Sequence, residues 1–143
     1  MFDPVMAHIS IIVFLALSFD FINGFHDTAN TIATSISTKA LPPRVAILFS
    51  AFMNLLGALT FTGVAQTIGG KIADPLVLDN GITIVAAALI AAISWNLITW
   101  YFGIPSSSSH ALIGSLAGAV IIAEGYMAVN YAGFITILEA LIF

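Results

Sequence analysis

The sequence predicts an all-α membrane protein with four to five hydrophobic helical segments. Of its 143 residues, 60% are hydrophobic and only 7% are charged. Soluble domains carry about 25% charged residues, whereas a helix that crosses a bilayer needs about 20 consecutive apolar residues. No Gly/Ser-rich linker or charge run divides the chain, so residues 1–143 are expected to form a single transmembrane unit that crosses the cell's inner (plasma) membrane several times.

Charge and cysteine content exclude several classes of function. The formal net charge is -4 and only 3 residues are Lys or Arg, which leaves no basic surface for nucleic acid. The absence of Cys excludes disulfides, thiolate metal sites and cysteine nucleophiles. An enzyme is not expected, because no G-x-S-x-G motif is present and no acid is positioned to orient His110. We expect no resident metal ion and no cofactor.

A stripe of polar side chains lies inside the first apolar segment, which begins near Val5. Its members follow one another at steps of three and four, and on a helix they share one face: Asp20, Asn23, Asp27, Asn30 and Thr34. A charged residue at membrane depth costs about 2.5–3.5 kcal/mol on insertion scales, so it usually faces a cavity, a partner or an ion path. The stripe therefore predicts a site; the alternative is that it only ties helices together.

We expect this first helix to unwind locally at Asn23 and Gly24. A glycine costs about 1 kcal/mol in a helix interior, and broken helices build ion sites in transporters. The paired Pro42 and Pro43 then end one helix and begin the next. The range from Val45 to Gly70 is free of charge and long enough to span. Within it, Asn54 has two open interpretations, an interhelical hydrogen bond or a ligand.

The apolar range from Gly81 to Phe102 ends at a Gly and a Pro that are followed by Ser106–Ser109, a strong signal for a break and a new helix. Two interpretations remain open: a re-entrant helical hairpin with its tip inside the membrane, or a full span with the serines at the cytoplasmic surface. The last apolar segment, Ala132 to Phe143, is shorter than a span, so we expect the chain to be one part of a longer polypeptide.

The two polar clusters favour binding a cation together with an anion. A helix that begins at Ser106–Ser109 offers free backbone N–H groups, hydroxyl donors and the positive end of the helix dipole, which suit phosphate or sulfate. Asp20 and Asp27 offer places for Na⁺, H⁺ or a metal ion. The imidazole of His26 could relay protons, since histidine titrates near neutral pH. His110 either bonds a neighbouring helix or helps to bind the anion.

Two stretches of the chain resemble conserved motifs of the inorganic phosphate transporter (PiT) family, in the form of the bacterial low-affinity phosphate permeases. They are NGFHDTAN at residues 23–30 and WNLITWYFGIPSSSSHALIG at residues 95–114. The resemblance implies one half of an inverted-repeat symporter, specifically the N-terminal repeat. It implies phosphate binding by Asp27, Asn30, Ser106, Ser107, Ser108 and Ser109, with Asn23 and His110 in less defined roles. With Asp20, the group formed by Asn23, His26 and Asp27 makes up the candidate coupling-ion site.

Two departures from the family pattern bear on the coupling ion. Many sodium-coupled members have Asn where this chain has His26, and an acid where it has Asn54. Both changes favour protons over sodium, with phosphate carried as a neutral metal complex as a further expectation. Only one repeat is present, so a second transporter half or self-pairing is expected to complete the site. The alternatives are a permease for sulfate or another oxyanion, and a non-transporting fragment or accessory membrane subunit.

Overall fold

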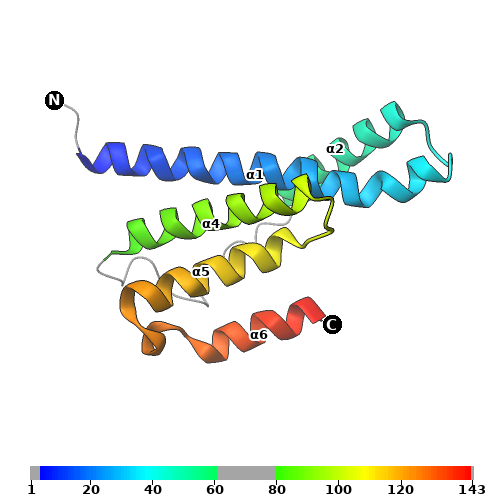
Figure 1. Ribbon diagram of the computed structural model, residues 1–143. Coiled ribbons are helices and arrows are strands. Elements are labelled where there is room, and N and C mark those ends of the chain that lie inside the picture. Colours follow the sequence, from blue (N-terminus) through cyan, green and yellow to red (C-terminus); the bar gives the residue numbers. More distant parts are fainter. Residues whose placement is uncertain (1–3, 61–79, 143) are drawn as a thin grey trace.

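The computed structural model describes residues 4–60 and 80–142, and these parts of the chain are helical and contain no strand (Figure 1). The α-helices are α1 (Pro4–Ser37), α2 (Pro43–Thr60), α4 (Gly81–Tyr101), α5 (Ser108–Glu124) and α6 (Tyr131–Ile142), with a 3-10 helix at Tyr126–Ala128. The prediction of an all-α protein is confirmed. Of the predicted span from Val45 to Gly70, α2 covers the first part, and residues 61–70 lie outside the described residues.

Three of the described helices, α1, α2 and α4, are long and apolar enough to cross a membrane. Large apolar side chains cover their outer surfaces: Leu48, Phe52 and Leu59 of α2, for example, are all exposed. Such a surface is unusual for a soluble monomer, whose exposed apolar patches are small. It is what contact with lipid requires.

Helix α1 runs without a break from Pro4 to Ser37, so the predicted unwinding at Asn23 and Gly24 is wrong. A Cβ atom added at Gly24 would meet no atom within 4 Å, which means that nothing approaches the backbone closely there. One glycine costs only about 1 kcal/mol, and packing of the surrounding turns against α4 offsets it. The paired prolines act as expected, since α1 ends at Ser37 and α2 begins at Pro43.

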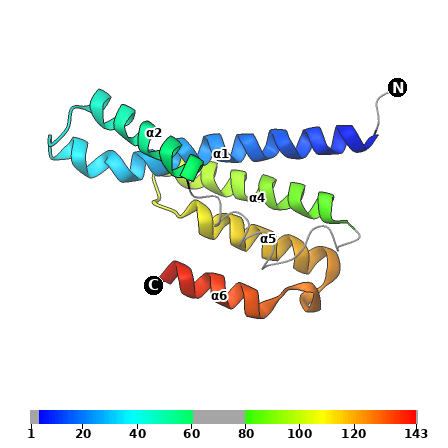
Figure 2. The same ribbon diagram turned by 180° about the vertical axis from the view of Figure 1, so that it is seen from behind.

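Helices α4 and α5 form the predicted helical hairpin (Figure 2). The turn between them uses Gly103 at a φ of 65°, a conformation that favours glycine. Buried apolar residues of both helices form the main core, which Val129 and Ile137 of the following segments extend. The α4 and α5 members of this core are Ile84, Ala88, Ile113, Leu116, Ala117 and Val120.

Helix α1 lies beside α4 and runs in the same direction (Figures 1 and 2). Phe19 packs with Leu89 and Ala92 in a second buried cluster. The tip of the hairpin meets α1 at Asp27, which at 1.5 Å per residue lies about 15 Å before the end of α1 at Ser37. Re-entry of the hairpin into the membrane stays a prediction.

Candidate functional site

The two polar segments singled out in the sequence meet where the hairpin tip touches α1. The Ser108 hydroxyl donates a hydrogen bond of 3.2 Å to Oδ1 of Asp27, joining residues that are 81 positions apart. Ser108 is buried and is the first residue of α5. The Asp27 carboxylate, 49% exposed, therefore lies at the positive end of the α5 dipole, where a negative charge is stabilised.

His26 lies beside this contact and is only 4% exposed. Its Nδ1 atom is 3.7 Å from Oδ1 of Asp27 and 3.5 Å from Nδ2 of Asn30. On the other side of the ring, Nε2 is 3.4 Å from Oγ1 of Thr99, on α4. Three helices therefore contribute to one polar cluster, which we call the Asp27 cluster: His26, Asp27, Asn30, Thr99 and Ser108.

A small cavity of about 180 Å³ opens beside the Asp27 cluster. His26, Asn30 and Thr99 provide its polar walls. The turn of the hairpin closes another side through Gly103, Ile104 and Pro105. The cavity is large enough for a small oxyanion, and it presents amide, hydroxyl and imidazole groups to it.

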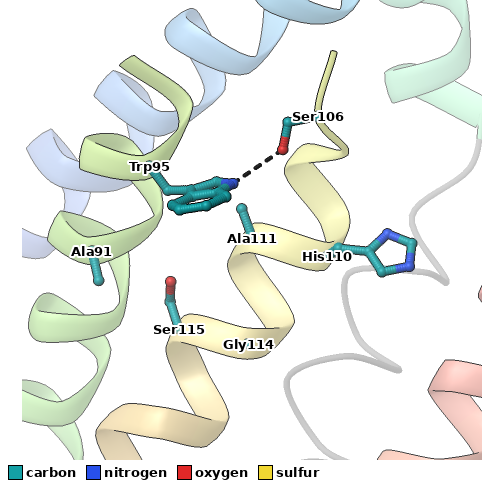
Figure 3. A pocket seen from close by; sticks show the side chains of 7 residues that line it. All are labelled: Ala91, Trp95, Ser106, His110, Ala111, Gly114 and Ser115. Atoms are coloured by element: carbon teal, nitrogen blue, oxygen red, sulfur yellow. Dashed lines mark hydrogen bonds between the residues drawn. The ribbon is translucent and has the colours of Figure 1, made fainter. Parts of the chain in front are cut away.

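The four consecutive serines have different surroundings rather than one shared site. Ser106 accepts a 3.0 Å hydrogen bond from the indole Nε1 of Trp95 (Figure 3). Ser107 caps α5 by accepting from the backbone N–H of His110. Ser109 is exposed. Of the four, only Ser108 has a hydrogen bond to the Asp27 cluster in the described parts of the chain.

His110 points away from the Trp95–Ser106 pair (Figure 3). Its side chain is exposed and borders a second, open cavity of about 530 Å³, which residues of both α4 and α5 line. Small residues, Ala91, Ala111 and Gly114, line much of this cavity. It is therefore a separate surface from the Asp27 cluster.

The remaining predicted site residues lie outside the Asp27 cluster. Asp20 is exposed and makes no hydrogen bond or ion pair within the described residues. Asn23 has a buried Oδ1 atom without a partner there. Asn54 donates to Oγ1 of Thr28 at 3.5 Å, so it makes the interhelical hydrogen bond that was one of its two interpretations.

Sequence reasoning placed three residues of α4, namely Trp95, Asn96 and Thr99, in the family motif but gave them no individual role in the candidate site. Trp95 bonds Ser106, and Thr99 bonds His26. Asn96 is fully buried, at 0% exposure, and neither atom of its amide has a partner in the described structure. The sequence could have indicated these residues, because polar groups inside a charge-free span are energetically costly and usually face the protein interior.

Comparison with known proteins decides the family. Residues 23–143 match the model of the "Phosphate transporter family". The chain belongs to this family. Membership confirms the resemblance noted in the sequence, and the family consists of transporters rather than enzymes. Together with the three long apolar helices, it makes the chain a multi-pass integral membrane protein, in bacteria one of the plasma membrane.

Several bacterial members of the phosphate transporter family are closely similar to the chain. A probable low-affinity inorganic phosphate transporter of Bacillus subtilis is 67% identical over 132 residues, covering 92% of this chain and 40% of that protein. One from Streptomyces halstedii is 48% identical, covering 93% of this chain and 62% of that protein. The chain thus spans about 40% of the Bacillus relative's length. No solved structure matches it.

Proposed function

We propose that this chain is part of a cation-coupled symporter that carries inorganic phosphate across the cell membrane, with protons favoured over sodium. The observation that carries the proposal is the Ser108–Asp27 hydrogen bond, which joins the two motifs at one point. The names of the relatives, low-affinity inorganic phosphate transporters, support phosphate as the substrate. We further propose that the anion binds at the α5 N-terminus, where the Asn30 amide donates to it and the Ser108 hydroxyl turns from Asp27 to donate to it.

Electrostatics supports coupling to a cation. The Asp27 carboxylate already occupies the favourable end of the α5 dipole, and an incoming phosphate would be repelled by it. No Lys or Arg of the described residues belongs to the Asp27 cluster, since Lys39 and Arg44 lie at the α1–α2 turn. A cation that offsets the charge of Asp27 would therefore strengthen phosphate binding, and phosphate would strengthen cation binding by the same factor.

The neighbourhood of Asp27 favours a proton as that cation. His26 is buried within 3.7 Å of the carboxylate, and imidazole is the side chain that exchanges protons near neutral pH. Within the described residues, the hydrogen bonds at Oδ1 of Asp27 bring only the Ser108 hydroxyl as a further oxygen ligand, which is a sparse set for a sodium ion. Carriage of phosphate as a neutral metal complex is compatible with this arrangement, because the cation would then arrive with the cargo.

Uptake of labelled phosphate by cells that lack their own phosphate uptake tests the proposal. We expect Asp27→Asn, in the complete transporter, to abolish uptake while the protein still inserts into the membrane, because the amide cannot carry the charge that binds the proton. Uptake at the wild-type level by this variant would refute the assignment. Competition by unlabelled sulfate as strong as that by phosphate would instead favour a general oxyanion permease.

A further inference from the structure

The surroundings of the Thr99 hydroxyl bear on which ring nitrogen of His26 carries the proton. The Thr99 side chain is only 2% exposed, and its Oγ1 atom is 3.0 Å from the carbonyl oxygen of Trp95 and 3.1 Å from that of Asn96. A hydroxyl has a single proton, which Thr99 donates to these carbonyls, so its oxygen can only accept a hydrogen bond from His26. Oγ1 therefore accepts a hydrogen bond from Nε2–H of the imidazole.

The other ring nitrogen of His26 faces two groups of opposite kind. With the proton on Nε2, Nδ1 of a neutral imidazole has a lone pair and can only accept. The Asn30 amide, 3.5 Å away, supplies a matching donor. The Asp27 carboxylate, 3.7 Å away, is an acceptor and does not match. Neutral His26 thus accepts a hydrogen bond from Asn30, and Asp27 accepts one from Ser108.

We propose that Thr99 is a positioning residue that holds neutral His26 in the Nε2–H form. An arriving proton then binds Nδ1, and the hydrogen-bond partner of Nδ1 changes from Asn30 to Asp27. This inference rests on the proposed function. A proton from water forms the new Nδ1–H bond, and this group donates to Oδ1 of Asp27. The Asn30 amide loses its acceptor and becomes free to donate to a phosphate oxygen. Release reverses these steps and returns the proton to water.

A single proton would therefore have two effects on phosphate binding. It offsets the negative charge of Asp27, which otherwise repels the anion, and it releases a hydrogen-bond donor for that anion. Both effects act in the same direction. Because linkage is reciprocal, bound phosphate would in turn favour the protonated imidazole.

Among residues 4–60 and 80–142, Asp27 is the charged group that lies next to His26. Helix α4 has no Asp, Glu, Lys, Arg or His between Gly81 and Tyr101. Helix α5 contributes Ser108 here, while its titratable residues are the exposed His110 and, at its opposite end, Glu124. On α2, Arg44 lies in the first turn, and on α1 the nearest other acid, Asp20, is exposed.

Two variants of Thr99 in the complete transporter test the inference. Thr99→Val keeps the shape but removes the acceptor, and Thr99→Ser keeps the acceptor as the matched control. We expect wild-type protein and Thr99→Ser to bind phosphate at least about fivefold more tightly at about pH 6 than at about pH 8. For Thr99→Val this ratio should fall to about half of the wild-type value or less, as measured by half-saturation of uptake. Titration of phosphate itself affects all three proteins equally.

Nitrogen NMR of ¹⁵N-histidine-labelled wild-type transporter reads the tautomer directly and does not depend on any variant folding. A neutral His26 with its proton on Nε2 supports the inference, and one with its proton on Nδ1 overturns it. An unchanged pH ratio in Thr99→Val also overturns it, provided that Asp27→Asn has lost uptake. If Asp27→Asn keeps wild-type uptake, the proposed function itself fails and this inference falls with it.

Discussion

Neighbouring serines at the hairpin tip differ in what they contact, although the sequence makes them look equivalent. The side chain of Ser108 is buried and bonded to Asp27, whereas Ser106 is bonded to the partly exposed indole of Trp95. The difference follows from the break before α5. Ser108 is the first residue of the helix and faces α1, while Ser106 still belongs to the turn.

We therefore expect Ser108→Ala to weaken phosphate uptake and Ser106→Ala to leave it nearly unchanged. Ser108→Ala removes the hydroxyl that we propose donates to phosphate. A hydrogen bond to a charged group contributes about 1.5–3 kcal/mol, so the half-saturating phosphate concentration should rise about tenfold or more. Half-saturation of uptake, normalised to the amount of protein in the membrane, measures this. Equal effects of the two substitutions would show that the serines share one site after all.

At the scale of helices, α4 contains a residue, Asn96, whose burial is energetically unfavourable. Its amide is fully buried against the neighbouring helices and is unpartnered in the described structure. A buried polar group without a partner costs about 1–3 kcal/mol. One helical turn away on either side, Ala92 packs against Phe19 and Thr99 bonds His26, so Asn96 lies within the α1–α4 contact.

Replacing Asn96 with Leu, which has a similar volume, should stabilise the transporter by about 1–3 kcal/mol because the unpaired amide is removed. Thermal unfolding of the purified complete transporter in detergent should then show a raised Tm. Asn54→Leu is the matched control, since it removes an amide that donates to Thr28 and should not raise the Tm. A lowered Tm for Asn96→Leu would mean that the amide has a partner in the complete protein.

Much of the helical layout could be predicted from sequence, because its signals are local. Pro43 begins α2, and Gly103 with the serines marks the hairpin turn. The pairing of His26 with Thr99 could not be predicted, because it joins residues 73 positions apart and depends on how α1 and α4 are aligned. The predicted break at Gly24 is wrong for a related reason, since tertiary packing outweighs the low helix propensity of one residue.

At the scale of the whole molecule, the polar stripe of α1 is only partly covered. Asp27 and Asn23 are partly buried, but Asp20, Asn30 and Thr34 are exposed on a helix long enough to span a membrane. Lipid cannot satisfy these groups. We therefore propose that a second transporter half, or a second copy of this chain, covers that face. The Bacillus relative is long enough for this, because the chain covers only 40% of it.

This proposal predicts that the chain needs a partner for transport. Expressed alone in cells without phosphate uptake of their own, it should give no labelled-phosphate uptake. Coexpression with the remaining part of a complete family member should restore uptake, and Asp27→Asn in this chain should remove it again, which ties the activity to the Asp27 cluster. Uptake by the chain alone, lost in Asp27→Asn, would instead mean that two copies pair with each other. In that case the exposed faces of two α1 helices would cover one another, and chemical crosslinking of the chain in the membrane would trap a dimer.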